Sequence, residues 1–520
     1  MAKFHVKIIK AFFILAVAML VLAMVSGINI IRNGSFPSRE SLEMEIDYLR
    51  YKNALGSKIP ANSANPEVPV SSSEISIPVL LYHGVIKNPK SKTDETNISL
   101  EAFRDQMFAL KKLGYRTITM SDFYDFMKNG KKIPKKSFLL TFDDGRRDSY
   151  YPVDPLLRAL GYNAVMFAIT GQSFASTGRE NQFYLSLSEL QKMERSGRWE
   201  IESHGDFDHD WEKIGENEEK GHFISNRLWL SEQNREETED EAKKRIISDL
   251  ENSKAKIKKY IGTDAVAFAF PFNDYGQEEK NFPGADSFIE KNIGRIYPLN
   301  FYQVKNDDPV VNYFNPKQIY IKRIDVNTEM DSKKLINIFT QNQEKYIPFS
   351  DSFWKDQGWI SRWGKKRVWG DLEIGDEIGE KSGNLTILLG TRRWNNYSIK
   401  STFRIEQGNS LSQVVKYKDD NNYSLCNFSA SEVSIVERRN GKEYTLAESA
   451  GVPNLSLSGD NFSETLSRDG KITCFLNGVK YVESGTDTAP GGEIGFYFWD
   501  DLPGNSFIRV KKIEVIQLVP

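Results

Sequence analysis

The sequence is poor in cysteine and histidine and has no large excess of charge of either sign. Only two cysteines occur in 520 residues, so the fold is not a disulfide framework; Cys426 and Cys474 form either one bridge or two buried thiols. The formal net charge is −2, which argues against a general attraction to nucleic acid. No short-period repeat is visible, which excludes solenoids. What remains is a large globular protein with 39% hydrophobic residues.

An uncharged segment near the N-terminus is long enough to cross a bilayer. Lys3, Lys7 and Lys10 precede the apolar run from Ala11 to Ile31. A run of this length can span a bilayer as a helix, and the lysines before it keep the N-terminus in the cytoplasm. We therefore expect residues 1–34 to form a cytoplasmic tail and a single-pass transmembrane helix, with the rest of the chain outside the cell membrane. A cleaved signal peptide is the alternative, but the run is long and lacks an Ala-x-Ala site.

The composition changes along the rest of the chain. Residues 35–76 begin with the charged stretch Ser38–Leu55, which is compatible with a short helix, and continue with a stretch rich in Pro, Ser and Asn; together they are typical of a stalk and linker. Residues 77–348 alternate helix-like stretches such as Leu100–Leu113 with short apolar runs such as Ser137–Phe142, which predicts an α/β fold with parallel strands, in the form of a barrel. Residues 349–520 carry short β-type segments between turns, which predicts an antiparallel β-sandwich.

Two adjacent carboxylates follow one of these apolar runs. Asp143 and Asp144 stand directly after Ser137–Phe142 and before Gly145. The carboxyl end of a strand is where a parallel barrel presents its functional loops. Neighbouring carboxylates there can divide two roles, one binding a cation and one facing the substrate. Because Asp-Asp-Gly is also a common turn sequence, this motif alone does not establish a site.

Two of the five histidines lie close together after another apolar segment. His204 and His209 follow Trp199–Ile201. Neutral imidazole is a common ligand of zinc-like ions, and two histidines with one carboxylate leave coordination positions open for water and substrate. With Asp144, the pair therefore predicts a catalytic divalent-metal site. Zinc is the expected ion, with cobalt and nickel as alternatives.

These motifs resemble those of the polysaccharide deacetylase family, the NodB-homology carbohydrate esterases. Thr141–Gly145 is similar to the first motif of that family and His204–His209 to the second. Phe268–Phe272 is similar to the third, and Arg323–Asp325 lies near the fourth. The resemblance covers about residues 77–338. It implies a distorted (β/α) barrel that hydrolyses acetyl groups on a polysaccharide.

Two departures from the common pattern resemble one branch of the family. The histidines of the second motif are one residue further apart than in many members, and no Leu-x-x-x-His motif ends the domain. Both features are similar to the circularly permuted branch, the exported poly-β-1,6-N-acetylglucosamine deacetylases. In that branch the late histidine stands at the start of the domain, where His83 fits the position.

The resemblance implies a role for each motif residue. Asp143 would be the general base and His83 the general acid, while Asp144, His204 and His209 would bind the metal. Groove-lining and orienting roles fall to the remaining residues, Phe270, Pro271, Phe272, Arg323 and Asp325. The third-motif arginine of many relatives is absent, and Arg323 with Asp325 either replaces it or forms a structural ion pair.

Other polar residues of this region carry weaker expectations. Asp206 and Asp208 either orient the histidines or are solvated loop acids. His222 lies in a charged insertion and has no evident partner. The helix expected over Glu236–Tyr260 is heavily charged, which predicts a position on the outside of the domain.

The C-terminal region resembles a concanavalin- or laminin-G-like jelly roll, a fold that does not by itself give a function. Its tryptophans either stack on sugar rings, which would raise the local concentration of substrate, or form the core. They are Trp354, Trp359, Trp363, Trp369, Trp394 and Trp499.

The main hypothesis is a membrane-anchored, metal-dependent enzyme that removes N-acetyl groups from an extracytoplasmic amino-sugar polysaccharide such as poly-N-acetylglucosamine. One alternative is a deacetylase of peptidoglycan, chitin-type or O-acetylated glycans. The other is a glycan-binding surface protein without turnover.

Overall fold

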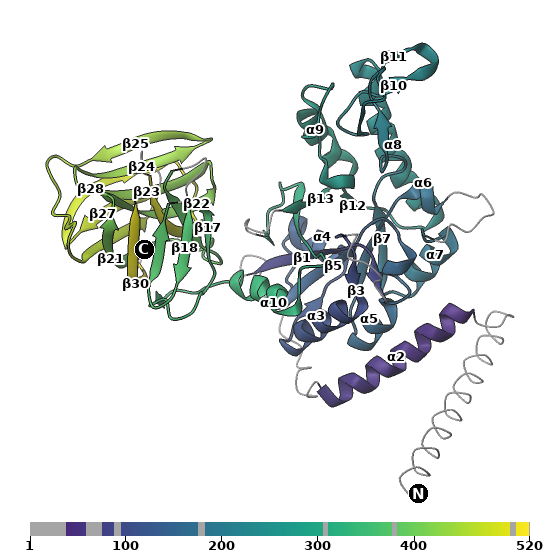
Figure 1. The fold of residues 1–520 in the computed structure, drawn as a ribbon, viewed down its shortest axis with the longest axis horizontal. Helices are drawn as coiled ribbons and strands as arrows, with labels where there is room; N and C mark the ends of the chain where they lie inside the picture. Colours follow the sequence, from purple (N-terminus) through teal and green to yellow (C-terminus); the bar gives the residue numbers. More distant parts are fainter. Residues whose placement is uncertain are drawn as a thin grey trace, which may run out of the picture. The chain divides into compact units, whose positions relative to one another are not determined.

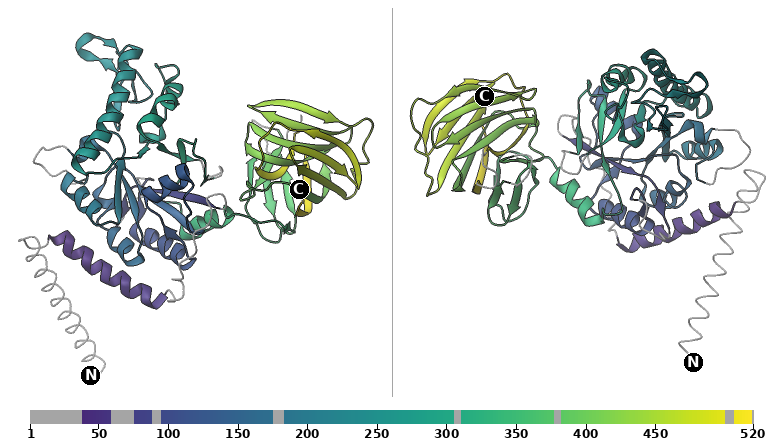
Figure 2. Two further views of the ribbon diagram at one scale, coloured as in Figure 1. Left: turned by 180° about the vertical axis from the view of Figure 1, so that it is seen from behind. Right: turned by 45° about the horizontal axis from the view of Figure 1, so that its top comes forward.

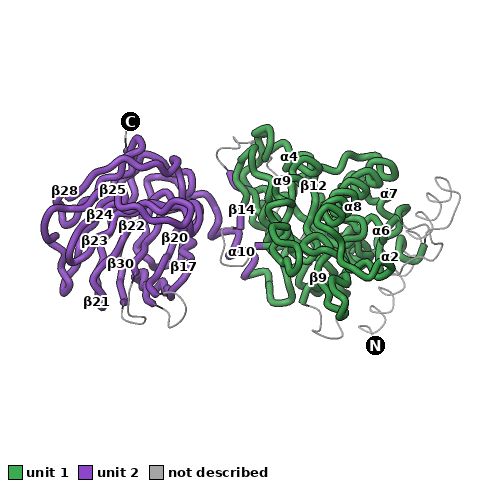
Figure 3. The backbone as a smooth tube through the Cα atoms, turned by 90° about the horizontal axis from the view of Figure 1, so that it is seen from above, with its two compact units in different colours: residues 1–73, 77–303, 312–333 green, residues 74–76, 304–311, 334–520 purple. Residues whose placement is uncertain are grey.

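The computed structural model describes residues 38–58, 75–87, 95–174, 183–304, 310–376, 382–499 and 506–518. These residues divide into two compact units, coloured separately in Figure 3. Unit 1 contains residues 1–73, 77–303 and 312–333, and unit 2 contains residues 74–76, 304–311 and 334–520. Unit 2 thus takes in residues 334–348, which we expected in the first domain.

The predicted transmembrane anchor over residues 1–34 lies outside the described residues. Among the helices that are described, none is both long and apolar enough to cross a membrane.

A closed ring of parallel strands forms the centre of unit 1 (Figure 1). Its members are β1 (Ser76–Tyr82), β5 (Ser137–Phe142), β6 (Ala164–Ala168), β7 (Trp199–Ser203), β12 (Ala267–Ala269), β13 (Leu299–Val304) and β15 (Tyr320–Asp325). Strand β1 closes the ring because it pairs in parallel with both β5 and β15. The short strands β4 (Arg116–Thr117) and β14 (Val311–Tyr313) extend the sheet. The predicted parallel α/β barrel is confirmed.

The ring strands are buried on both faces. All six residues of β5 and all five of β6 are buried, because the barrel interior covers one face and helices cover the other. A polar residue in such a strand must find a partner within the fold. Thr141 does so by donating its hydroxyl hydrogen to the Leu80 carbonyl at 2.7 Å.

Helices follow the strands and surround the ring (Figure 1). They are α3 (Leu100–Lys112), α4 (Met120–Asn129), α5 (Asp154–Leu160), α6 (Thr170–Ser173), α7 (Leu187–Arg195), α8 (Glu239–Tyr260) and α9 (Ala285–Ile296). In α3, Phe103, Met107 and Leu110 form a buried stripe at helical spacing, and Ser99 caps the first turn by accepting from the Ala102 amide. The helix expected near Leu100–Leu113 is therefore confirmed.

Helix α2 (Arg39–Lys58) lies in the segment that we expected to be a stalk. It belongs to unit 1 and packs against α5. Arg158 of α5 contacts Glu45 at 2.6 Å and lies 3.8 Å from the centre of the Tyr48 ring. A charged helix can thus dock through an arginine that serves one acidic and one aromatic neighbour.

Two antiparallel sheets form unit 2, seen in two further views in Figure 2. One sheet contains β16 (Phe349–Asp351), β18 (Lys365–Val368), β19 (Leu372–Gly375), β21 (Tyr397–Gln407), β26 (Asn461–Arg468), β27 (Lys471–Leu476), β28 (Val479–Gly485) and β30 (Phe507–Gln517). The other contains β17 (Trp359–Trp363), β20 (Asn384–Leu388), β22 (Ser410–Asp419), β23 (Asn422–Ser429), β24 (Val433–Arg439), β25 (Lys442–Glu448) and β29 (Glu493–Phe498). The predicted C-terminal antiparallel sheets are confirmed, and helix α10 (Ser332–Gln341) precedes them.

A disulfide joins the two sheets of unit 2. Cys426 of β23 and Cys474 of β27 are bonded, with their Cα atoms 5.8 Å apart. Both side chains lie in the core cluster between the sheets. Of the two alternatives that the sequence left open, the structure has the bridge.

Replacing both Cys426 and Cys474 with alanine should lower the free energy of unfolding of unit 2. The bridge closes a loop with a sequence separation of 48, for which chain entropy predicts a stabilisation of about 4 kcal/mol. Calorimetry of the full-length chain measures the loss. Reduced wild-type protein should show a similar shift, and an unchanged transition for unit 2 would contradict the structural role of the bridge.

The tryptophans of unit 2 divide between core and surface. Trp359 and Trp394 lie in the core cluster, and Trp363 is partly buried. The others are exposed, namely Trp354 by 85%, Trp369 by 80% and Trp499 by 50%.

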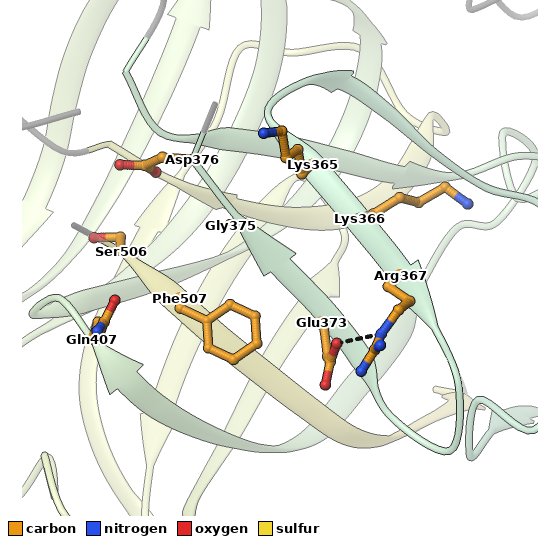
Figure 4. A pocket seen from close by; sticks show the side chains of 9 residues that line it. All are labelled: Lys365, Lys366, Arg367, Glu373, Gly375, Asp376, Gln407, Ser506 and Phe507. Carbon is orange, nitrogen blue, oxygen red and sulfur yellow. Dashed lines mark hydrogen bonds and ion pairs between the residues drawn. The ribbon is translucent and has the colours of Figure 1, made fainter. Parts of the chain in front are cut away.

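A polar hollow of about 470 Å³ lies beside strands β18 and β19 (Figure 4). Its lining consists of Lys365, Lys366, Arg367, Glu373, Gly375, Asp376, Gln407, Ser506 and Phe507. Arg367 and Glu373 already pair across it at 2.6 Å. None of the exposed tryptophans lines this hollow, whereas Trp354 lines a second hollow of about 520 Å³ in the same unit. Glycan binding by unit 2 stays a prediction.

Candidate active site

The polar motif residues gather at the carboxyl end of the barrel strands. His83 follows β1, Asp143 follows β5 and His204 follows β7. Arg323 and Asp325 stand at the end of β15. Residues from four separate parts of the sequence therefore meet at one edge of the barrel, which is the edge that carries functional loops in folds of this kind.

Asp143 forms a buried ion pair with Arg323. Arg323 Nη1 donates to Asp143 Oδ1 at 2.7 Å and Nη2 donates to Oδ2 at 2.8 Å. The side chain of Asp143 is 2% exposed and that of Arg323 is 0% exposed. Burial opposes the charge of Asp143, but Arg323 and the nearby histidines outweigh it and hold the pKa of this carboxyl below its usual value. Asp143 is thus held as an oriented carboxylate.

Asp144 faces the two histidines of the second motif. Its Oδ1 lies 3.4 Å from His204 Nε2 and 3.3 Å from His209 Nε2. The backbone of Asp144 has φ 71°, so it turns the opposite way from Asp143, which separates the two carboxylates. Burial opposes the charge, but the neighbouring His204, His209 and His83 outweigh it and hold the pKa of Asp144 well below its usual value.

The three side chains fit a divalent metal. One ligand atom from each residue lies within 4.8 Å of the others. A tetrahedral zinc ion with bonds of about 2.0–2.1 Å separates its ligand atoms by about 3.3–3.4 Å, which matches both distances from Asp144. His204 Nδ1 donates a hydrogen bond to the Ala269 carbonyl at 2.8 Å, so the lone pair that faces the site belongs to Nε2. Asp144, His204 and His209 would therefore hold such an ion.

Helix α8 supports the loop that carries the two histidines. Asp249 accepts hydrogen bonds from the backbone amides of Asp206 and Phe207 at 2.9 and 2.8 Å. Ser253 donates to the Gly205 carbonyl at 3.1 Å. The charged sequence of α8 predicted a helix on the outside of the domain. It did not reveal that the face with Asp249 and Ser253 packs against the histidine loop, because only the tertiary fold brings the two together.

Asp206 and Asp208 are both 2% exposed, so neither is a solvated loop acid. Asp206 instead accepts hydrogen bonds from Thr170 at 2.7 Å and Lys256 at 2.6 Å. A Cβ atom at Gly205 would lie 1.5 Å from Asp208 Oδ1. Glycine is therefore required there for the Asp208 carboxylate to sit under the loop.

His83 lies near the acidic residues of the site. Ser149 fixes its backbone by donating to the His83 carbonyl at 2.7 Å. Its Nδ1 is buried and has no partner among the described residues. Burial raises the pKa of Asp325, and the charges of His83 and Arg323 partly offset that effect. The structure therefore places His83 and Asp325 together with the ion pair.

The third-motif residues separate in the structure. Phe270 is 1% exposed and packs in the core of unit 1, and Pro271 is buried. Only Phe272 is exposed, by 39%, with its ring centre 4.7 Å from that of His209. The expected groove wall must therefore be corrected for Phe270 and Pro271, because the chain turns inward directly after β12.

Replacing Arg323 with methionine should lower the free energy of unfolding of unit 1 by about 3–5 kcal/mol, since it leaves the Asp143 charge buried without its partner. Lys258→Met is the matched control. Lys258 and Asp264 form a pair whose side chains are 55% and 69% exposed, and its loss should cost less than about 1 kcal/mol. Calorimetry of both variants measures the difference, and equal effects would contradict the burial of the Asp143 pair.

Comparison with known proteins identifies the class of this site. Residues 130–281 match the family model described as polysaccharide deacetylase. The chain thus contains a segment that matches this family, and the predicted resemblance is confirmed. The matched segment includes Asp143, Asp144, His204 and His209, whereas His83 and Arg323 lie outside it.

The names of two curated relatives are more specific than the family description, because they state a substrate. Over 179 residues the chain is 27% identical to the poly-β-1,6-N-acetyl-D-glucosamine N-deacetylase of Staphylococcus aureus strain N315, covering 34% of this chain and 53% of that protein. Over 210 residues it is 23% identical to the protein of the same name from Escherichia coli strain K12, covering 38% and 31%. The matched segments span about half and a third of these relatives.

Among solved structures, a de-N-acetylase from Aggregatibacter actinomycetemcomitans is 22% identical, with a TM-score of 0.43, and the match covers 51% of this chain and 99% of that one.

Proposed function

We propose that this protein removes N-acetyl groups from an extracytoplasmic amino-sugar polysaccharide by metal-dependent hydrolysis. The observation that carries the proposal is the position of Asp144, His204 and His209 beside the buried Asp143–Arg323 pair. Asp144, His204 and His209 would hold a divalent metal, and Asp143 is an oriented carboxylate that can take a proton. The names of the relatives support the same chemistry.

The metal, expected to be zinc with cobalt or nickel as alternatives, would polarise the acetyl carbonyl and acidify a water molecule when bound. The protein's own residues then handle the protons. Asp143 accepts the proton that water loses as its oxygen attacks the carbonyl carbon. Arg323 keeps both Asp143 oxygens in place and leaves each of them a second lone pair for that contact.

His83 completes the reaction as the general acid. Its ring donates a proton to the amide nitrogen as the carbon–nitrogen bond breaks, because an unprotonated amine is a very poor leaving group. Asp325 lies close enough for the charges of His83 and Arg323 to act on its carboxyl. The products are acetate and a glycan with a free amine, and water supplies the oxygen and both protons that they gain.

Poly-β-1,6-N-acetylglucosamine is the proposed substrate, since both curated relatives carry this polymer in their names. An uncleaved N-terminal helix would hold the enzyme at the outer face of the cell membrane, with the polymer as its partner. Peptidoglycan, chitin-type and O-acetylated glycans are the alternative substrates.

The variants Asp143→Ala and His204→Ala should distinguish the role of a general base from that of a metal ligand. Asp143→Ala should lower acetate release at least about 100-fold and still bind one zinc ion per chain, whereas His204→Ala should lose both. Asp264→Ala is the control, because this acid is exposed and pairs only with Lys258 among the described contacts. Acetate release and metal content of purified protein decide the matter, and full activity in either site variant would refute these roles.

Substrate preference needs a separate assay. The full-length chain should release acetate faster from β-1,6-linked N-acetylglucosamine oligomers than from chitin oligomers of equal length. Faster release from chitin would assign the enzyme to the alternative substrate. No release from either oligomer by zinc-loaded protein would contradict the proposed function.

A further inference from the structure

A row of rings leads from the metal ligands to the surface of unit 1. The ring centre of His209 lies 4.7 Å from that of Phe272, and Phe272 lies 4.7 Å from His222 with the two planes only 8° apart. Trp211 completes the row, 4.4 Å from His222 and 6.1 Å from Phe272. The outer rings are accessible, since Trp211 is 53% and Phe272 is 39% exposed. An exposed aromatic surface is thus continuous with the metal site.

The hairpin that carries Trp211 and His222 begins directly after the metal ligands. Strands β8 (Trp211–Lys213) and β9 (Lys220–His222) pair in antiparallel register, with Trp211 opposite His222. Trp211 is therefore tied to His209 through one intervening residue of the chain. Any movement of the hairpin would also move the ligand loop, so the two are built as one structure.

Phe272 is held toward solvent by an unusual backbone. Its φ of 56° and ψ of 14° lie in the left-handed region, as does the φ of 58° at Asn273, which a bulky residue adopts only at a cost. Asn273 compensates through two hydrogen bonds with Gln303, at 3.2 and 2.6 Å. Without this turn, an apolar ring following Phe270 would be expected to join the core.

His222 is fixed in the middle of the row. Its Nδ1 donates to Asp274 Oδ2 at 2.9 Å, and the Asp274 side chain is fully buried. Ser225 donates to the same oxygen, and the Gly276 amide donates to Oδ1 at 2.8 Å. These contacts fix the orientation of the His222 ring beside Phe272 and Trp211.

Trp211 and Phe272 present exposed rings next to the metal ligand His209. Such a surface suits a sugar, which has an apolar face that packs on aromatic rings.

We propose that Trp211 and Phe272 form a subsite for the sugar residue next to the one that is deacetylated, with His222 as the residue that positions both rings. This inference rests on the proposed function, since a polymer whose acetamido group lies at the metal must continue along a neighbouring surface. The adjoining sugar stacks on Trp211 and contacts the Phe272 ring. Chain length, rather than the acetyl group, is what this surface recognises.

The test compares a pentamer of β-1,6-linked N-acetylglucosamine with the monosaccharide, using the full-length, zinc-loaded chain. Trp211→Ala should raise KM for the pentamer about three- to tenfold, with kcat, zinc content and the slow rate on the monosaccharide unchanged. Trp211→Phe should restore most of the affinity because it keeps a ring. His222→Gln should raise KM in the same way, since its amide can still donate to Asp274 while the stacking ring is lost.

Trp229→Ala is the matched control, because Trp229 lies in the neighbouring hairpin with its ring near the Lys213 ammonium, and it should leave KM unchanged. An unchanged KM in Trp211→Ala, or an equal loss on pentamer and monosaccharide, would overturn the subsite. If wild-type protein releases no acetate, the proposed function has failed. Calorimetric binding of the pentamer then decides the subsite alone, supported by weaker binding to Trp211→Ala and overturned by equal binding.

Discussion

The site depends on the buried ion pair between Asp143 and Arg323. These residues belong to β5 and β15, the two strands that flank β1 in the closed ring. The pair therefore spans the strand that His83 follows, and it fixes the position of Asp143 relative to that strand. With both side chains essentially inaccessible to water, the carboxylate keeps its charge only while the guanidinium is in place. The strand pairing that closes the barrel therefore also brings Arg323 to Asp143 and orients its carboxylate.

The second constraint acts on the metal ligands. Asp144 is turned away from Asp143 by its left-handed backbone, so one carboxylate faces Arg323 and the next faces the histidines. The histidine loop is held from below by Asp249 and Ser253 of α8. Rigid supports of this kind keep ligands in position before an ion arrives. The neighbouring hairpin then extends this rigid edge outward through Phe272 and His222 to Trp211.

Much of this arrangement was predictable from the sequence. Apolar runs ending in Asp143 and near His204 indicated barrel strands with functional loops, and the family resemblance linked them to His83. The partner of Asp143 was harder to assign, because an Arg-x-Asp pair such as Arg323 and Asp325 has no distinctive local pattern. Its burial depends on β15 reaching β1 across the ring, which is a long-range pairing that no window of sequence records.

Other features could not be read from residue patterns at all. The inner face of α8 is masked by its charged residues, and Asp249 resembles any other acid in such a helix. His222 acquires its partner Asp274 only when the third-motif loop folds beside the β8–β9 hairpin. Phe270 and Phe272 look equivalent in sequence, yet one backbone turn sends the first into the core and the second to the surface. Each of these depends on tertiary contacts between distant segments.

The most direct test of the account is a metal titration of the chelator-treated, full-length chain, with acetate release and bound zinc measured in the same samples. The account predicts that release appears with the first ion bound to the Asp144, His204 and His209 set and reaches its maximum at one ion per chain. Acetate release that persists in metal-free protein, or that does not change as this site fills, would contradict it.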